Sequence, residues 1–261
     1  MKLSIVPAGQ GLQWVKLGIR TFLKQPLALA GLFFMFMAVM SVLSLIPVLG
    51  NVLALAILPG ATLGLMAATK DASQGKFPVP MVLVSAFRAD KTRLHAMLIL
   101  GALYAAGFLL VLGVTALADG GKFARLYLIG GSMSGELLQS TDFEAALLLA
   151  MVLYMPLSLM FWHAPALVHW HGVSPVKSLF FSLVACMRNF WAFTVFGFVW
   201  VGVFIAMGMV VATIAALLGS PDMVPAIMFP ASMLLAAMFF TSIYYTFRDC
   251  FEEPEPTGDT P

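Results

Sequence analysis

Charge is what this chain has least of, and its absences are long and continuous. Lys, Arg, Asp and Glu make up 10% of the 261 residues, against 61% hydrophobic residues, and the mean hydropathy is +0.99. A helix of about 20 apolar residues crosses the hydrocarbon core of a bilayer. Five windows hold no charged residue at all: Leu27 to Thr69, Leu94 to Ala118, Ala145 to Val168, Phe190 to Ser220 and Met223 to Phe247. The pattern excludes a soluble globular protein and predicts a polytopic helical membrane protein.

The residues that usually carry chemistry inside membranes are also missing. Membrane enzymes and ion-coupled pumps place ionisable groups at mid-depth, and the five windows hold no Asp, Glu, Lys or Arg. Paired carboxylates, a His-Glu metal motif, a glycine-rich phosphate loop and a nucleophile elbow are absent as well. Cys186 and Cys250 are too far apart in sequence for a metal or redox motif. We therefore expect no enzymatic activity, cofactor, metal or nucleic-acid partner.

The apolar windows predict an all-α fold with six spanning helices in a single integral membrane domain, residues 1–250. Pro47 to Asn51 divides the first window into two spans. The expected spans are 27–47, 51–69, 94–118, 144–170, 190–218 and 221–247. Residues 251–261 are acidic and rich in proline, and we expect them to form a disordered tail.

The basic residues predict the orientation, since Lys and Arg are retained on the cytoplasmic side. With the N-terminus inside, twelve of the 14 basic residues fall in the cytoplasm, and only Lys122 and Arg125 fall outside. The twelve are Lys2, Lys16, Arg20, Lys24, Lys70, Lys76, Arg88, Lys91, Arg93, Lys177, Arg188 and Arg248. Both termini are therefore predicted to be cytoplasmic, in the inner membrane of a bacterium.

Three shorter segments, about 10–25, 80–90 and 174–188, are predicted to be amphipathic helices lying in the membrane interface. In the first, Gln13, Lys16, Arg20 and Lys24 form one polar stripe, opposite an apolar side made of Leu12, Val15, Ile19, Phe22 and Leu23, with Trp14 beside them. In the third, Val176, Leu179, Phe180, Leu183 and Met187 form the apolar face, opposite Lys177, Ser178 and Ser182. The candidate residues for binding anionic lipid headgroups are Lys16, Arg20, Lys24, Lys177 and Arg188.

These segments suggest a three-fold repeat of an interfacial helix followed by a helical hairpin. Each ends on a basic residue, Lys24, Lys91 or Arg188, that lies three positions before an apolar run. The alternative is that any span entering from the inside begins after a basic anchor.

The main polar cluster consists of His163, His169 and His171, at the cytoplasmic end of the fourth span. Imidazoles bind metal or haem, but His163 and His169 are six residues apart, about 120° and roughly 9 Å on a helix. They do not form a chelating pair. We interpret His169 and His171 as interfacial residues beside Trp170.

Small residues predict close helix packing. Gly60 and Gly64 form a Gly-x-x-x-Gly pair, which lets helix backbones approach. Packing within the chain is the preferred interpretation, and a homo-oligomer or a membrane-protein partner is the other. A polar cavity would instead favour a transporter, and its expected lining is Thr62, Thr115, Ser158, Thr213 and Thr241.

The stretch Phe161-Trp-His-Ala-Pro165-Ala-Leu-Val-His-Trp-His-Gly172-Val-Ser174-Pro-Val-Lys177-Ser-Leu-Phe-Phe-Ser182, followed by Arg188-Asn-Phe-Trp191, resembles an uncharacterised proteobacterial six-span family. That family is related to the membrane domain attached to some glycerophosphodiester phosphodiesterases. The resemblance implies an inner-membrane protein of unknown function and supplies no catalytic residue, because the phosphodiesterase chemistry belongs to a separate soluble domain.

The leading hypothesis is therefore a non-enzymatic protein that binds membrane lipids or a partner protein. A transporter or permease for an apolar or amphiphilic solute is the alternative. A lipid-headgroup enzyme ranks third, and it would require His163, His169, Lys177 and Arg188 to converge in one pocket.

Overall fold

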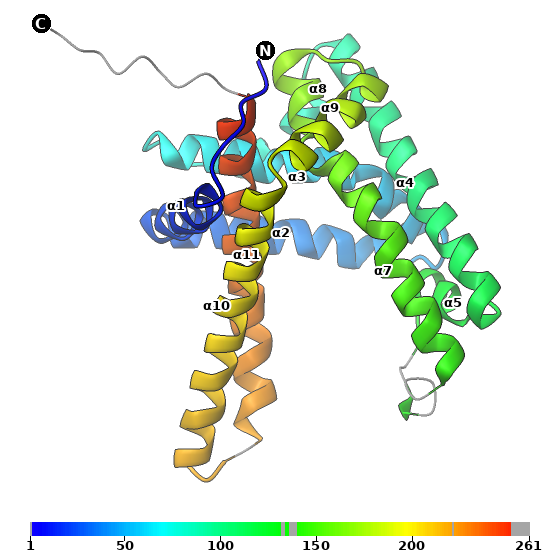
Figure 1. Ribbon diagram of the computed structural model, residues 1–261, viewed down its shortest axis with the longest axis vertical. Helices are drawn as coiled ribbons and strands as arrows, with labels where there is room; N and C mark the ends of the chain where they lie inside the picture. Colours follow the sequence, from blue (N-terminus) through cyan, green and yellow to red (C-terminus); the bar gives the residue numbers. More distant parts are fainter. Residues whose placement is uncertain (1, 132–133, 136–139, 221, 252–261) are drawn as a thin grey trace, which may run out of the picture. The chain divides into compact units, whose positions relative to one another are not determined.

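The computed structural model describes residues 2–131, 134–135, 140–220 and 222–251, and within these ranges it contains helices and no strand (Figure 1). The helices are α1 (Gln10–Lys24), α2 (Pro26–Ser44), α3 (Leu49–Ser73), η1 (Pro80–Phe87), α4 (Lys91–Asp119), α5 (Lys122–Ile129), α7 (Thr141–Trp162), α8 (Ala164–His171), α9 (Pro175–Arg188), α10 (Phe190–Leu217) and α11 (Met223–Phe251). The all-α class is confirmed.

Six helices in the described ranges are long and apolar enough to cross a membrane, as the sequence predicts. They are α2, α3, α4, α10, α11 and the broken helix formed by α7 and α8. The helix α11 continues through Phe251, the first residue of the predicted tail. Phe251 is buried and stacks on Phe247 with ring centroids 5.4 Å apart, so packing extends the helix. The rest of the predicted disordered tail, 252–261, lies outside the described residues.

The chain forms two compact units. Unit 1 contains Met1–Phe33, Leu65–Val82 and Ala185–Pro261, and unit 2 contains Phe34–Gly64 and Leu83–Val184. The prediction of a single integral membrane domain stays a prediction.

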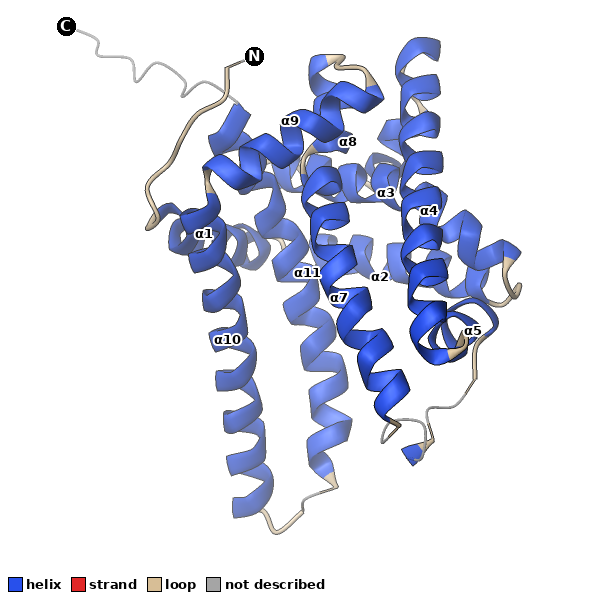
Figure 2. Cartoon of the chain, turned by 45° about the vertical axis from the view of Figure 1, so that its right-hand side comes forward, coloured by secondary structure: helices blue, strands red, loops and turns tan. Residues whose placement is uncertain are grey.

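In unit 1, α10 and α11 run side by side, and α1 packs on both of them (Figures 1 and 2). Two glycines permit this close packing. A Cβ on Gly11 would lie 2.2 Å from the carbonyl oxygen of Ala192, and one on Gly18 would lie 2.8 Å from the Cα of Ser242. Glycine at these two positions lets α1 lie directly against both helices.

In unit 2, α4 and α7 lie side by side (Figure 2). The Gly60 and Gly64 pair packs within the chain, as predicted. A Cβ on Gly60 would come within 2.5 Å of the Phe87 ring, and one on Gly64 within 2.7 Å of the Cα of Leu83. The 3₁₀ helix η1 therefore occupies the groove that these two glycines leave on α3.

The helix α5 lies in a segment predicted only as an outer loop. The buried carboxylate of Asp119 accepts hydrogen bonds from the backbone N–H groups of Gly121, at 2.8 Å, and Phe123, at 2.6 Å. The carbonyl of Leu128 accepts from the backbone N–H of Val48, at 2.8 Å, and from the amide of Asn51, at 2.9 Å. The short helix is thus tied to the turn between α2 and α3, which is also predicted to lie outside.

Short helices occur at all three positions predicted for interfacial segments, namely α1, η1 and α9. The second is a 3₁₀ helix and differs in type from the other two. The three-fold repeat stays a prediction.

Candidate functional site

One side of the first helix, α1, packs against the rest of the protein, and the other side is exposed. Its buried residues are Gly11, Trp14, Val15, Gly18, Thr21 and Phe22. Its exposed basic residues are Lys16, Arg20 and Lys24, which we call the basic stripe. Within the described ranges none of these three cations forms an ion pair. The stripe therefore carries three uncompensated positive charges over about 12 Å of helix.

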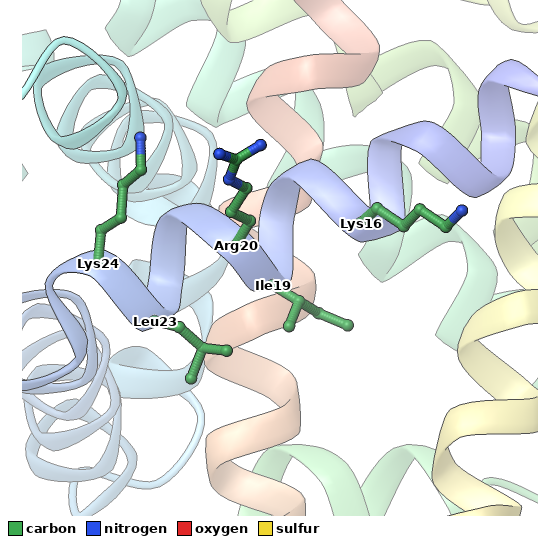
Figure 3. Close-up of a pocket in the computed structure, with 5 residues that line it drawn as sticks. All are labelled: Lys16, Ile19, Arg20, Leu23 and Lys24. Atoms are coloured by element: carbon green, nitrogen blue, oxygen red, sulfur yellow. The ribbon is translucent and has the colours of Figure 1, made fainter.

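A shallow, open pocket of about 410 Å³, with a mainly apolar lining surface, lies along the basic stripe. Its lining consists of Lys16, Ile19, Arg20, Leu23 and Lys24. Figure 3 shows Arg20 and Lys24 extending to one side of α1, and Ile19 and Leu23 extending to the other. Leu23 is 62% exposed, so apolar surface adjoins the cations. The pocket suits a ligand that is anionic at one end and apolar at the other.

The apolar side of α1 is partly buried in the protein, whereas the sequence predicted that it faces lipid. Val15, Phe22 and Trp14, expected at the lipid interface, are 2%, 3% and 0% exposed. Trp14 packs against Phe193 and Phe196 of α10, with ring centroids 5.2 and 6.1 Å apart. Three of the six residues on the predicted lipid face are thus protein contacts, and the exposed apolar surface is the narrower strip that contains Leu23.

Hydrogen bonds fix the rotation of α1 about its axis. One carboxylate oxygen of Asp249 accepts from the side-chain amide of Gln10, at 2.6 Å, and from the indole N–H of Trp14, at 2.9 Å. The hydroxyl groups of Thr21 and Tyr245 are also hydrogen-bonded. Because these contacts lie on the buried side, they hold the basic stripe outward.

The N-terminal segment is held against the end of α11 by Asn189, a residue that the sequence prediction did not single out. Its side-chain oxygen accepts from the backbone N–H of Val6, at 2.8 Å, and its amide donates to the carbonyl of Ser4, at 3.1 Å. The backbone N–H of Ser4 donates to the carbonyl of Cys250, at 2.9 Å. Both ends of the described chain therefore lie at the same end of unit 1.

The fourth span is broken at His163, two residues before Pro165. In a continuous helix the N–H of His163 would donate to the carbonyl of Leu159. Instead the Ser182 hydroxyl of α9 accepts from that N–H, at 2.9 Å, and donates to that carbonyl, at 2.7 Å. Pro165 favours the break, because its ring clashes with the carbonyl four residues earlier. Ser182 therefore supplies both backbone groups with a partner at the break.

The histidine cluster does not form one exposed site. His163 is 0% exposed, His169 is half-buried and His171 is exposed. Lys177 and Arg188 are exposed at opposite ends of α9. Among the described residues no group of three or more His, Cys, Asp or Glu side chains is arranged to hold a metal ion.

The hydroxyls proposed to line a transport cavity bond mainly to their own helices. Thr115, Ser158, Thr213 and Thr241 each donate to a backbone carbonyl three or four residues earlier. Such local bonds are a common way to satisfy a hydroxyl within a helix. These four residues therefore give the transport hypothesis no specific support.

The six apolar helices define a multi-pass α-helical membrane protein. No protein-family model matches the chain, and no solved structure matches it. A probable inner membrane protein of Burkholderia thailandensis is 39% identical to it over 259 residues, which cover 98% of this chain and 96% of that protein. The chain belongs to the family of this inner membrane protein.

Proposed function

We propose that this protein binds anionic phospholipids through the basic stripe of α1. One observation carries the proposal: Lys16, Arg20 and Lys24 share a pocket with the apolar side chains of Ile19 and Leu23. A phospholipid has both matching parts, since its phosphate pairs with the cations and its acyl chain covers the apolar residues. Lys177 and Arg188 are further candidates, but they lie at opposite ends of α9 and do not form a stripe.

The number of charges in the stripe gives the expected gain in affinity for anionic lipid. A Lys or Arg near an anionic leaflet contributes about 1 kcal/mol, so three contribute about 3 kcal/mol, roughly 100-fold in a binding constant. The predicted cytoplasmic position of both termini agrees with this role, because the anionic lipids there face the stripe. The resemblance to the membrane domain of glycerophosphodiester phosphodiesterases stays a prediction, and a lipid-phosphate ligand agrees with it.

The test uses the full-length protein in nanodiscs of phosphatidylcholine with a small fraction of phosphatidylglycerol. Native mass spectrometry then counts the lipids that the protein retains. We expect the wild type to retain phosphatidylglycerol and the triple variant Lys16→Gln, Arg20→Gln, Lys24→Gln to lose most of it.

The matched control removes the same number of exposed cations elsewhere, in the variant Lys76→Gln, Lys122→Gln, Arg125→Gln. It should retain phosphatidylglycerol as the wild type does. Equal retention by the stripe variant and this control would reject the proposal.

A further inference from the structure

We infer that the acidic segment 252–261 of this chain occupies the basic stripe of α1 when anionic lipid is absent, so that segment and lipid compete for it. This inference rests on the proposed function and adds the regulation of that site. The segment contains Glu252, Glu253, Glu255 and Asp259 and no basic residue. The stripe contains three cations and no acidic residue, so the two are complementary in charge.

The position of the last residues of α11 brings the start of the segment to α1. Asp249 lies two residues before the end of α11 at Phe251. Its carboxylate bonds to Gln10 and Trp14 of α1, at 2.6 and 2.9 Å. Trp14 is two residues from Lys16, the first cation of the stripe. The acidic segment therefore begins beside the helix that it is proposed to cover.

The acidic segment is long enough to cover the basic stripe. Ten residues follow Phe251, and an extended chain of that length spans at most about 33–36 Å. The stripe, from Lys16 to Lys24, covers about 12 Å of helix. The segment can therefore reach all three cations from its starting point.

Other basic residues lie nearer to the start of the acidic segment, but they are weaker partners for it than the basic stripe. Arg248 is already paired with Asp249, at 2.8 Å, and lies over the Tyr245 ring. Lys2 and Arg188 are also close, because Ser4 bonds to the carbonyl of Cys250 and Asn189, next to Arg188, bonds to the sulfur of Cys250. Each is a single charge, whereas the stripe offers three. Exposed ion pairs are individually weak and screened by salt, so an anionic lipid can displace the segment.

The first experiment detects the contact directly in the full-length protein in phosphatidylcholine nanodiscs. A zero-length carbodiimide joins lysine amines to carboxylates that touch them, and mass spectrometry identifies the linked peptides. We expect links from 252–261 to Lys16 or Lys24 that decrease when phosphatidylglycerol or salt is added. Links to Lys2 alone, or none, would overturn the inference.

The second experiment measures competition. The variant Glu252→Gln, Glu253→Gln, Glu255→Gln, Asp259→Asn should retain about fivefold more phosphatidylglycerol than the wild type at a low fraction of that lipid. The neutral control Thr257→Ala, Thr260→Ala should not change retention. In the background of the stripe variant, neutralising the segment should have no effect.

The outcomes separate the two proposals. If the links form but the stripe variant retains as much phosphatidylglycerol as its control, the contact stands, whereas the lipid function and the competition fail. If the stripe variant loses the lipid but neutralising the segment changes nothing, the lipid function stands and the competition fails.

Discussion

The helices α1 and α9 have similar amphipathic sequences, but they bury opposite kinds of residue. In α1 the aromatic and aliphatic residues Trp14, Val15 and Phe22 are buried, and the cations are exposed. In α9 the hydroxyl residues Ser178 and Ser182 are 0% exposed. Its exposed large apolar residues are Val176, Phe180 and Met187, which are 70%, 62% and 57% exposed.

The difference shows that a polar stripe does not by itself indicate which face of a membrane-protein helix is buried. In lipid an exposed apolar side chain costs little, whereas a backbone group without a partner is expensive. Ser182 faces inward because the broken fourth span needs a hydroxyl there. The cations of α1 face outward because they have no such partner.

The largest effect should come from removing the anchor of α1. Trp14→Ala removes a fully buried ring and one of the donors to Asp249. A change of this kind in a core costs about 3–5 kcal/mol. Thermal unfolding of the purified protein should show a marked loss of stability. Gln13→Ala, at an exposed position on the same helix, is the control, and similar loss in both would contradict the packing of α1.

A smaller effect is expected at the buried serines of α9, which form a matched pair. Ser182→Ala leaves the N–H of His163 and the carbonyl of Leu159 without their hydroxyl partner, at a cost of about 1–3 kcal/mol. Among the described residues Ser178 donates to the carbonyl of Pro175 in its own helix, so Ser178→Ala should cost less. Denaturant unfolding of both variants makes the comparison, and a larger loss for Ser178→Ala would refute the role of Ser182.

The smallest effect on stability should come from spin labels at exposed positions of α1 and α9. These labels should also report whether each helix faces lipid or water. Lys16→Cys and Phe180→Cys should each change stability by less than about 0.5 kcal/mol. We expect the label at 180 to be more accessible to oxygen, as in lipid, and the label at 16 to a water-soluble nickel complex. Equal accessibility ratios would mean that α1 and α9 expose their faces to the same medium.

The native cysteines need not be removed for this measurement. Cys186 and Cys250 are both buried and free of disulfides. Burial also raises the pKa of the Cys186 thiol, so little of the reactive thiolate is present. Leu23→Cys, on the apolar strip of α1, is the internal control and should resemble position 180.

The spans were predictable because they depend only on local composition. A charge-free window must become a helix in lipid, whatever its neighbours do. The groove around Gly60 and Gly64 was predictable for a similar reason, since small residues leave space for a neighbour. The cations of α1 were identified as a stripe from their spacing alone, and the structure places all three on one pocket.

The remaining features depend on partners that are distant in sequence. The hydroxyl that satisfies the backbone groups at the break belongs to Ser182, 19 residues after His163. The short helix α5 requires Asp119 at its start and bonds from Val48 and Asn51 near its end. Asn189 acts on the N-terminal segment, 183 residues away. A single asparagine before Phe190 and Trp191 carries no local signal of that contact.

The attachment of α1 to α11 also has a consequence for biosynthesis. Gln10 and its partner Asp249 are 239 residues apart, so α1 leaves the ribosome long before its docking surface exists. At about 5–20 residues per second, translation takes roughly 10–50 s to supply it. During that interval Trp14 and Phe22 have only the bilayer surface as an apolar partner, and the cations of α1 favour its anionic side. The helix α1 is thus made early and docked late, after the C-terminal hairpin has been synthesised.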